Sequence, residues 1–492
     1  MADGVADDVA RQPDGATESG GATDGDSSVR LAGAIPPPVH EALATLWRAG
    51  HGAFVVGGAL RDTLIGRETA DWDLATSALP EQTVGLFDHA VYENAFGTVA
   101  VRGGPQTLEL TTFRSDHDYA DFRRPHRVEF GTSIEADLAR RDFTMNALAW
   151  GRPAGAGGLG DAVLLDPFGG LADIGDRTIR AVGEPRNRFE EDALRIVRAI
   201  RFAASLGWTI EPATLQAIHE TAPLVGHLSG ERIAKELDKL LAAGQPSGGL
   251  RLLESTGVLA AISPELAAQR GVAQNKIAGE DLWDHTVRSV DAAPLVGAPD
   301  LTIVRWAALL HDIGKPATAA EGHFYHHDMV GAELADALLD RLRFATATRA
   351  RVVQLVRHHM FLYEPTWGDP AVRRFLARIG PSAIDQLFAL RRADNVGSGL
   401  SPDVDDLAGF RRRIAGELAA GAILDRSALA IDGSDLMAEL GLTQGPELGR
   451  ILNALFDRIV EDPELNDRSA LLALARTMAR PGDTSGERAT DR

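Results

Sequence analysis

Residues 57–62 read Gly-Gly-Ala-Leu-Arg-Asp, and Asp-Trp-Asp follows at residues 71–73. Residues 51–58 form a short apolar segment that predicts a buried strand ending in the diglycine, and a helix can start within residues 59–65. The backbone N–H groups of such a turn and helix start can approach a triphosphate closely, and Arg61 can neutralise it. The alternative is an ordinary solvated turn.

Asp71 and Asp73 form the second half of this pattern. On a strand, residues two apart project from the same face, so both carboxylates are expected on one side of a sheet. Two carboxylates held that close repel each other unless a hard cation lies between them. A pair of Mg²⁺ ions could then hold an attacking 3′-hydroxyl and an α-phosphate together. Either half of the pattern alone fits exposed acidic residues, whereas the two together predict nucleotidyl transfer.

Two further segments, residues 97–101 and 108–114, alternate apolar and polar residues and are rich in β-branched side chains. They predict two antiparallel strands. Glu109 would then lie beside the aspartate pair as a third acidic group. The alternative is a glutamate on the exposed face of a strand.

Three more stretches complete the pattern: Arg-Arg-Asp-Phe-Thr-Met-Asn-Ala at residues 140–147, Asp-Pro-Phe-Gly-Gly at 166–170 and Glu-Asp-Ala-Leu-Arg at 191–195. In this order the chain closely resembles the class II tRNA nucleotidyltransferases, which include the CCA-adding enzymes and bacterial poly(A) polymerases. The resemblance implies an α+β fold. Its head would be a DNA-polymerase-β-like nucleotidyltransferase with a mixed sheet, followed by all-α neck, HD and tail domains.

The resemblance also implies roles for single residues. It makes Asp71 and Asp73 the Mg²⁺ ligands. Glu109, from its place on the predicted strand, is the candidate for a third catalytic carboxylate. The resemblance implies that the nucleotide is bound by Gly57, Gly58, Arg61, Arg141, Asp142 and Asn146, where Arg141 and Asp142 hold the ribose and phosphates and Asn146 supports the turn.

Asp192 and Arg195 would act as an amino-acid template for the base of CTP or ATP. A carboxylate beside a guanidinium can accept from an exocyclic amine and donate to the ring, which selects cytosine and adenine over uracil and guanine. Arg198 and Arg201 repeat the three-residue step, so the four residues would share one stripe of a helix and the two arginines would contact the triphosphate. The alternative is an ion pair on a solvated helix.

Composition limits the function classes. The chain has 492 residues, enough for about three domains. It has no cysteine, which excludes disulfides, thiolate metal sites and cysteine nucleophiles. No apolar run approaches the length of a membrane span and the start does not resemble a signal peptide, so a cytoplasmic protein is expected. A net charge of −20 is unusual for an RNA-binding protein, but part of it is local, because residues 1–30 contain seven Asp or Glu against two Arg. A basic cleft on an otherwise acidic molecule is expected to bind RNA.

The pass along the chain predicts six segments. They are an acidic disordered tail at 1–32, the catalytic head at 33–175, a helical neck that binds nucleobase and RNA at 176–260, an HD domain at 275–400, a helical region at 401–480 and a disordered tail at 481–492. Within the head, the polar segment 113–135 matches the position of a mobile loop that the family needs for addition of the terminal A; the alternative is a long surface loop.

A second group of residues indicates separate chemistry. His285, His311-Asp312, His326-His327, His358-His359 and Asp394 follow the order of an HD metal-dependent phosphohydrolase domain. Histidine and aspartate ligands without thiolates suit Mn²⁺, Fe²⁺ or Ni²⁺. The family's spacing selects His327 and His358 from the two pairs, giving the ligands His285, His311, Asp312, His327, His358 and Asp394. The alternative is a degenerate HD fold that serves as a structural arm.

The predicted function is template-independent addition or repair of the 3′-terminal CCA of tRNA from CTP and ATP, with loss of pyrophosphate and with Mg²⁺ as cofactor. The expected partners are the tRNA 3′ end and the two nucleotides, with no membrane. Within the same chemistry, an A-adding enzyme or a poly(A) polymerase is the alternative. From another class, the head could be a nucleotide sensor that controls an HD phosphohydrolase. The oligomeric state stays open.

Overall fold

The computed structural model describes residues 24–69, 71–92, 97–103, 106–119, 125–131, 133–155, 162–274, 276–295, 302–422 and 424–479. The chain divides into two compact units. The first unit contains residues up to Asp192 together with Trp208–Ala217, and the second contains Ala193–Gly207 and the chain from Ile218 onward. Each unit is described by itself.

The first unit is built on a mixed, seven-stranded sheet with the order β3-β4-β5-β2-β1-β8-β9. Only β2 and β5 run parallel, and the other neighbours are antiparallel. The strands are β1 (Ala53–Val56), β2 (Asp73–Thr76), β3 (Ala90–Tyr92), β4 (Thr98–Gly103), β5 (Gln106–Thr112), β8 (Ala149–Arg152) and β9 (Val163–Leu165). The predicted antiparallel pairing of the segments around residues 97 and 108 is therefore confirmed by β4 and β5.

Helices cover both faces of this sheet. The helices are α1 (Asp24–Ala34), α2 (Pro37–Arg48), α3 (Gly58–Leu64), α4 (Pro80–Leu86), α5 (Ile134–Ala139), α6 (Gly170–Gly175) and α7 (Pro185–Glu191). Because side chains alternate along β1, Val55 enters a core with residues of α1 to α3, while Phe54 enters a second core with residues of α5. The sheet edge that carries the acidic residues is thus held between two apolar layers.

Two local predictions for this unit are wrong. The acidic tail does not reach residue 32, because α1 begins at Asp24 and Leu31 is fully buried in the first core. The remaining tail residues, 1–23 and 480–492, lie outside the described residues. The segment predicted as a loop at 113–135 instead forms an antiparallel hairpin of β6 (Arg114–Tyr119) and β7 (Pro125–Phe130), followed by the start of α5. Residues 120–124 at its tip lie outside the described residues.

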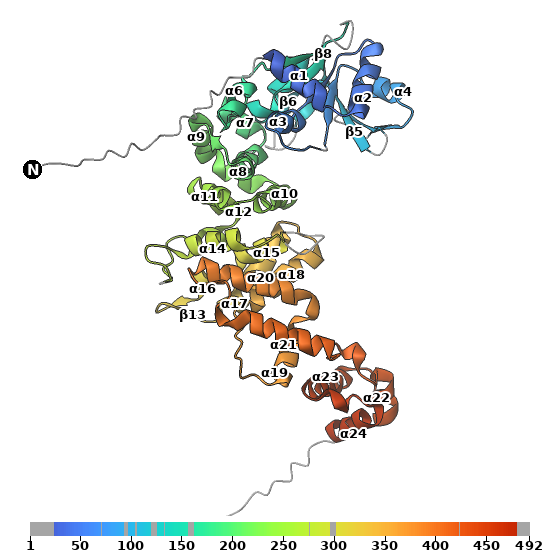
Figure 1. The fold of residues 1–492 in the computed structure, drawn as a ribbon, viewed down its shortest axis with the longest axis vertical. Coiled ribbons are helices and arrows are strands. Elements are labelled where there is room, and N and C mark those ends of the chain that lie inside the picture. The colour runs from blue at the N-terminus through green and yellow to red at the C-terminus, as the bar shows by residue number, and fades with distance from the viewer. Residues whose placement is uncertain are drawn as a thin grey trace, which may run out of the picture. The chain divides into compact units, whose positions relative to one another are not determined.

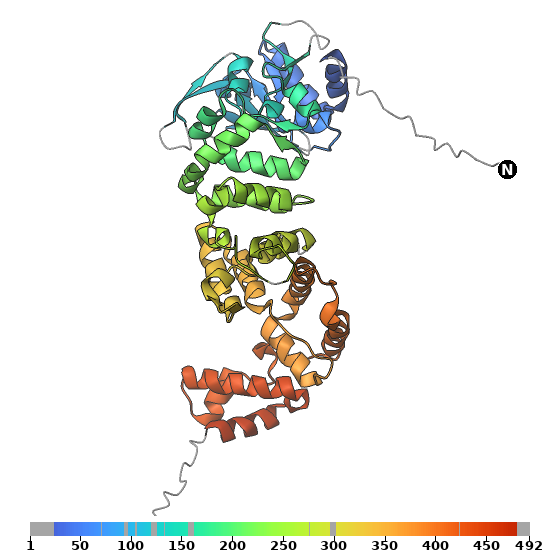
Figure 2. The ribbon, with the colours of Figure 1, turned by 90° about the vertical axis from the view of Figure 1, so that its left-hand side faces the viewer.

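The second unit consists mainly of helices (Figure 1, Figure 2). Its neck contains α8 (Leu194–Leu206), α10 (Gly230–Leu241), α11 (Ser247–Ser255), α12 (Val258–Ile262) and α13 (Pro264–Ala267). Next come α14 (Leu282–Ala292), α15 (Ile303–Leu310), α16 (Lys315–Thr318), α17 (His327–Arg341), α18 (Thr346–His358), α19 (Asp369–Ile379) and α20 (Pro381–Gly397). The last helices are α21 (Leu407–Ala419), α22 (Gly433–Leu440), α23 (Pro446–Glu461) and α24 (Arg468–Ala479). Short strand pairs, β10 (Thr178–Ile179) with β11 (Thr209–Ile210) in the first unit and β12 (Ala319–Ala320) with β13 (His323–Phe324) in the second, complete the fold.

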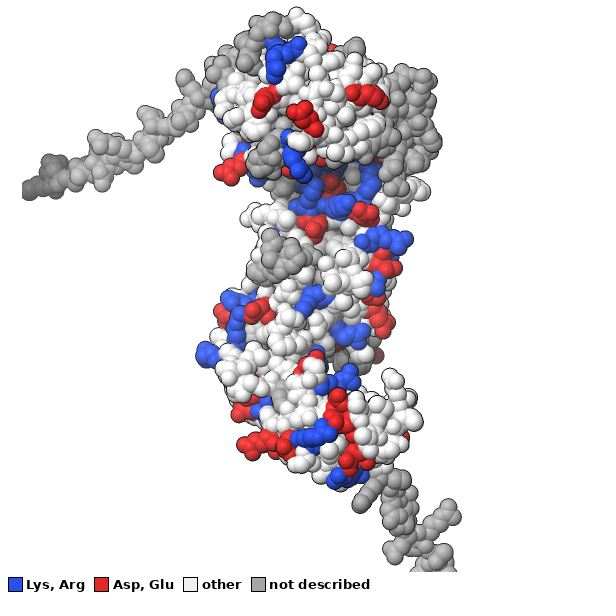
Figure 3. All heavy atoms as spheres, turned by 90° about the vertical axis from the view of Figure 1, so that its right-hand side faces the viewer, with Lys and Arg blue, Asp and Glu red and all other residues white. Residues whose placement is uncertain are grey.

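One face of the second unit carries a mixture of basic and acidic side chains (Figure 3). In the lower part of Figure 3, basic and acidic side chains lie next to each other. Ion pairs also join the last helices, such as Arg468 with Asp435 and Arg476 with Glu439. Among the described residues, no helix has both the length and the apolar character that a membrane crossing requires.

Candidate active site and metal centre

The predicted catalytic carboxylates lie at one edge of the central strands. Asp73, the first residue of β2, pairs in register with Glu109 on β5 and with Val56 on β1. Residues directly opposite each other project from the same face, so Glu109 stands beside Asp73. Asp71 precedes the strand, and the prediction that both aspartates belong to it is wrong for Asp71. Among the described residues, the three carboxylates do not form a group whose ligand atoms all lie within 4.8 Å.

Gly57 brings the phosphate-binding turn close to these carboxylates. It has φ 78° and ψ −141° at the start of α3, a backbone conformation open essentially only to glycine. A Cβ atom there would lie 2.9 Å from Nη1 of Arg141 and 3.7 Å from Oδ2 of Asp73. The missing side chain therefore lets a guanidinium and a carboxylate converge on one turn.

The charge of Asp73 is influenced by its surroundings. The Asp73 residue is in contact with solvent, but protein atoms surround much of its carboxylate. This loss of solvation raises the pKa of Asp73. The Arg141 guanidinium lowers that pKa, while the negative charge of Asp71 raises it further, and the net direction is upward. A carboxylate whose ionised form is disfavoured in this way is stabilised more by a bound cation than a carboxylate surrounded by water.

Arg61 is more deeply buried than the sequence predicts for a triphosphate contact. Its side chain is only 7% exposed, and its Nη1 donates to Oδ1 of Asn146 at 2.6 Å. Nδ2 of Asn146 in turn donates to Oδ1 of Asp142 at 3.0 Å. Arg61 also pairs with Asp62 at 2.9 Å. These bonds tie α3 to the turn at 142–146 and support the predicted structural role of Asn146.

Asp137 is a functional candidate that the sequence analysis missed. It lies on α5, is 1% exposed, and accepts from Nη2 of Arg140 at 2.9 Å and from Nη2 of Arg141 at 3.3 Å. Burial would raise the pKa of Asp137, but the two guanidinium groups outweigh burial and lower it. Its spacing of three and four residues before the arginines on a helix could have revealed this pairing.

The predicted helical stripe of Asp192, Arg195, Arg198 and Arg201 is only partly present. Asp192 follows the end of α7 in an extended conformation, and α8 begins at Leu194. The prediction that Asp192 shares the helix is therefore wrong. Asp192 is also the last residue of the first unit before the chain enters the second. Arg195 lies on α8 and is 9% exposed.

Arg198 and Arg201 share a buried acid. Glu236 of α10 is 4% exposed, and its carboxylate lies 2.9 Å from Nε of Arg201 and 3.6 Å from Nη1 of Arg198. The guanidinium of Arg201 also stacks 3.5 Å from the ring centre of Phe202. The alternative predicted from the sequence is an ion pair along one helix, whereas the observed pairing joins two helices of the neck.

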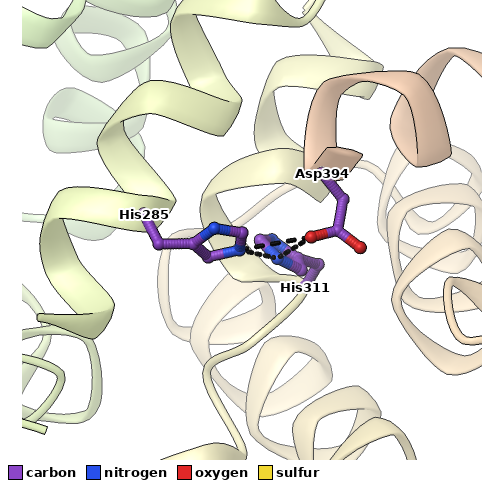
Figure 4. A group of neighbouring side chains, drawn as sticks. All are labelled: His285, His311 and Asp394. Carbon is purple, nitrogen blue, oxygen red and sulfur yellow. Dashed lines mark hydrogen bonds and ion pairs between the residues drawn. The ribbon is translucent and has the colours of Figure 1, made fainter. Parts of the chain in front are cut away.

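The second unit gathers histidines and aspartates from five different helical segments. His285 comes from α14, His311 and Asp312 directly follow α15, and Asp394 comes from α20. Figure 4 shows the imidazoles of His285 and His311 converging on the Asp394 carboxylate. His327 begins α17 and His359 directly follows α18. All six are buried, and they form two groups that could hold metal ions: His285 with His311 and Asp394, and Asp312 with His327 and His359.

Close backbone packing makes this cluster possible. A Cβ atom at Gly314, two residues after Asp312, would lie 2.3 Å from the carbonyl oxygen of His327 and 2.6 Å from the backbone nitrogen of Gly331. Only glycine permits this approach of the segment after Asp312 to α17. The His-Asp-x-Gly order in the sequence thus has a steric cause as well as a chemical one.

The orientation of the imidazoles tests whether the cluster fits a metal. Nδ1 of His311, His327 and His359 each lies 2.6 to 2.8 Å from a backbone carbonyl oxygen, which fixes the proton on Nδ1 and turns the Nε2 lone pair inward. Nε2 of His327 and of His359 is buried and has no hydrogen-bond partner among the described residues. Buried unpaired acceptors are costly, and a cation would satisfy them. The residues therefore fit a divalent metal.

Asp312 and Asp394 are held in the charged form. Burial would raise the pKa of Asp312, but the surrounding histidines and the Lys315 ammonium 2.6 Å away lower it well below its usual range. Burial likewise opposes ionisation of Asp394, but His285, His311 and Lys276 lower its pKa. Two ionised carboxylates are thus available as ligands.

The choice of His358 as a ligand is wrong. His358 is the last residue of α18, half-buried and outside both groups, whereas its neighbour His359 is 1% exposed with Nε2 3.6 Å from Oδ1 of Asp312. One residue changes the direction of a side chain on a helix by about 100°. The choice of His327 over His326 agrees with the structure, since Nε2 of His327 lies 3.4 Å from Oδ1 of Asp312.

Comparison with known proteins covers nearly the whole described chain. Four family models match in succession: "Poly A polymerase head domain" at residues 53–180, "Probable RNA and SrmB-binding site of polymerase A" at 207–270, "HD domain" at 282–396 and "tRNA nucleotidyltransferase domain 2 putative" at 410–475. A CCA-adding enzyme of Geobacillus thermodenitrificans is 34% identical over 443 residues, which are 89% of this chain and 97% of the relative. The chain belongs to the family of CCA-adding enzymes.

Other CCA-adding enzymes agree with this assignment. That of Levilactobacillus brevis is 34% identical over 88% of this chain and 95% of its own length. The solved structure of the Bacillus stearothermophilus CCA-adding enzyme in complex with CTP superposes with a TM-score of 0.66 at 29% identity, covering 90% of this chain and 98% of that one. The resemblance predicted from the sequence is therefore confirmed.

Proposed function

We propose that this CCA-adding enzyme adds or repairs the 3′-terminal CCA of tRNA without a nucleic-acid template, using CTP and ATP and releasing pyrophosphate. The alignment with a CCA-adding enzyme over 97% of that relative's length carries the proposal. The convergence of Gly57, Arg141, Asp73 and Glu109 at one sheet edge supplies the chemistry that such a reaction needs. A cytoplasmic location remains a prediction from the sequence.

In this proposal Asp71 and Asp73 hold Mg²⁺ through carboxylate oxygens, with Glu109 beside them. Mg²⁺, when bound, supplies charge stabilisation for an in-line displacement at the α-phosphate. Gly57 leaves room for the Arg141 guanidinium at the start of α3, and Arg141, fixed by Asp137, would contact the phosphate oxygens. Catalysis of this kind depends mostly on positioning and charge, which these fixed side chains provide.

Selection of the nucleotide is assigned to the residues that the family resemblance implies. Asp192 and Arg195 would bind the base edge of CTP or ATP, and Arg198 and Arg201 would lie close to the triphosphate. Arg198 and Arg201 are oriented by Glu236, which limits their freedom before the nucleotide arrives. Preorganisation of this kind lowers the entropy lost on binding.

An incorporation assay tests the proposal. Purified protein with Mg²⁺ is given tRNAs ending before the CCA, after C and after CC, with labelled CTP and ATP separately and together. Ordered addition that stops at CCA is expected. Addition of A alone onto CC ends would instead indicate an A-adding enzyme, and long A tails a poly(A) polymerase. The Asp73→Asn variant should lose incorporation with an unchanged circular dichroism spectrum, and retained turnover would contradict the metal assignment.

The histidine and aspartate cluster supports a second function, metal-dependent hydrolysis of phosphate esters. The ligand set, with nitrogen and oxygen donors, suits Mn²⁺, Ni²⁺ or Fe²⁺. In such hydrolysis the water oxygen bonds to phosphorus, the esterified oxygen leaves, and one water proton ends on that oxygen while the other stays on the phosphate. Asp312→Ala should abolish hydrolysis and keep nucleotide addition. Absence of both addition and hydrolysis in the metal-supplemented wild type would contradict both functions, and hydrolysis without addition would favour the sensor alternative.

A further inference from the structure

The guanidinium of Arg141 has two carboxylates of the first unit close to it. Its Nη2 donates to Oδ2 of Asp137 at 3.3 Å. Its Nη1 lies 2.9 Å from the position that a Cβ atom of Gly57 would occupy, and Oδ2 of Asp73 lies 3.7 Å from that same position. In the part of the chain that the structure describes, neither a hydrogen bond nor an ion pair joins Arg141 to Asp73. Arg141 is thus paired with Asp137, while another of its nitrogens lies near the candidate metal ligand Asp73.

The position of Asp137 relative to Asp73 is fixed by the core. Asp137 lies on α5, which packs through Ile134 and Leu138 against residues of β1 and β2 in the second apolar core. Asp73 is the first residue of β2. Because one core holds both elements, the Asp137 carboxylate cannot follow Arg141 if the guanidinium moves toward Asp73.

The two oxygens of Asp137 are divided between two arginines. Oδ1 accepts from Nε and Nη2 of Arg140 at 3.0 and 2.9 Å, which leaves Oδ2 to Arg141. The carbonyl oxygen of Asn146 lies 3.5 Å from Nη1 of Arg141 and provides a second, weaker acceptor. The carboxylate of Asp137 is therefore the main group that determines where the Arg141 guanidinium lies.

The two carboxylates differ in how strongly their surroundings favour the charged form. Burial opposes ionisation of Asp137, but Arg140 and Arg141 outweigh it and lower the pKa of Asp137. Burial raises the pKa of Asp73, and there the effect of Arg141 does not reverse the direction. Asp137 is only 1% exposed, so water screens its attraction for Arg141 little. These surroundings favour the pairing of Arg141 with Asp137 over a pairing with Asp73.

This preference has a consequence for metal binding, because a guanidinium and a metal ion compete for the same carboxylate oxygens. Without a charge on Asp137, Arg141 would be free to turn toward Asp73 beside the same glycine. An opposite charge at contact distance favours an ionised carboxylate by a factor of about ten or more. A metal ion would have to displace the guanidinium before it could bind Asp73.

We propose that Asp137 is a positioning residue of nucleotidyl transfer, which keeps Arg141 from pairing with Asp73 and so leaves the Asp73 carboxylate available to Mg²⁺. The same contact keeps the guanidinium available to the phosphates of the nucleotide. This inference rests on the nucleotidyl transfer proposed above. It goes further in assigning to a fully buried carboxylate the control over which cation binds Asp73.

Binding of CTP at increasing Mg²⁺ concentrations tests the inference without turnover. The full chain is stripped of metal with a chelator and titrated with CTP by calorimetry at each Mg²⁺ concentration. The measured quantity, the Mg²⁺ requirement, is the concentration that gives half of the total gain in CTP affinity. Asp137→Asn keeps the shape of the side chain and should raise the Mg²⁺ requirement by about tenfold. Glu211→Gln is the matched control, because Glu211 also pairs with an arginine of the first unit, Arg180, at 3.4 Å, and it should leave the Mg²⁺ requirement unchanged.

The variant Arg141→Gln separates positioning from a general loss of stability. In that background Asp137→Asn should not raise the Mg²⁺ requirement further, since no guanidinium is left to pair with Asp73. An equal rise with and without Arg141 would overturn the inference, because Asp137 would then act only through the stability of the unit. An unchanged Mg²⁺ requirement in Asp137→Asn alone would also overturn it and would leave the proposed nucleotidyl transfer intact.

Failure of the proposed function gives a different result. A wild-type protein that binds no CTP, or binds it equally well without Mg²⁺, would overturn both the function and the inference. Circular dichroism checks that Asp137→Asn is folded. If it is not, the double variant Arg140→Gln with Asp137→Asn, which removes one charge of each sign, replaces it. The double variant should show the same rise in the Mg²⁺ requirement, and no rise would overturn the inference.

Discussion

Replacing Glu236 by glutamine removes one negative charge between two helices of the neck and keeps the shape of the side chain. In the structure this buried carboxylate pairs with Arg201 at 2.9 Å and Arg198 at 3.6 Å. Removing one partner from a fully buried ion pair costs about 3–5 kcal/mol. The Arg198 side chain is 31% exposed and can turn to water, so we expect a smaller cost of about 1–3 kcal/mol.

Hydrogen exchange measures this cost locally, without requiring the whole chain to unfold in one step. A loss of about 1–3 kcal/mol should raise the exchange rates of protected amides in α8 and α10 by about five- to 150-fold. Glu231→Gln on the same helix is the matched control, because Glu231 pairs with Lys235 in the exposed state, with side chains 64% and 69% exposed. Its effect should be below about twofold.

Equal exchange in Glu236→Gln and Glu231→Gln would refute the reasoning, since the buried carboxylate would then contribute no more than a surface ion pair. If exchange rises as expected, the Michaelis constants for CTP and ATP should rise as well, because Arg198 and Arg201 lose the carboxylate that orients both of them. A rise in exchange with unchanged Michaelis constants would limit Glu236 to a structural role.

Three further outcomes are expected. Gly57→Ala forces a Cβ atom to within 2.9 Å of the Arg141 guanidinium at a positive φ, so incorporation should fall at least tenfold, whereas Gly66→Ala, at φ 74° with nothing within 4 Å of the added atom, should not affect it. Asp137→Asn should destabilise the first unit at pH 7. Because the pKa of Asp137 is lowered in the folded state, the ionised carboxylate stabilises the fold fully above about pH 4, and this stabilisation is lost as the pH falls through the lowered pKa. The melting temperatures of the variant and the wild type should therefore converge in acid. Arg195→Ala should weaken discrimination against UTP and GTP, and unchanged nucleotide selectivity would remove its template role.

Local patterns predicted the head well. The apolar run before the diglycine, the change to helix after it and the alternation around residue 109 each correspond to an element of the structure. These features depend on neighbours in sequence: a positive φ at Gly57 and the two-residue period of a strand. The register between neighbouring strands of the sheet could be predicted only in part. That Asp73 pairs with Glu109 on a parallel neighbour is decided by tertiary packing, which no local pattern contains.

Some contacts in the histidine and aspartate cluster of the HD domain could not be predicted from the sequence. Order and residue type indicated six ligands, but the choice between His358 and His359 depends on how α18 is rotated against the other helices. No contact was predicted for Lys276 or Lys315, because each resembles an ordinary surface cation until the fold places it beside Asp394 or Asp312.

Because the sequence does not show which charged side chains contact each other, the net charge of −20 does not predict how well this chain binds phosphate. Some of its acids are buried partners of the arginines that the family resemblance assigns to the nucleotide: Asp137 holds Arg141, and Glu236 holds Arg198 and Arg201. Each such acid cancels a charge in a count over the sequence. In the structure it fixes the direction of a guanidinium, so that less conformational entropy is lost when a phosphate binds. Removing these acids would make the protein more basic, and we expect it to bind nucleotide less well.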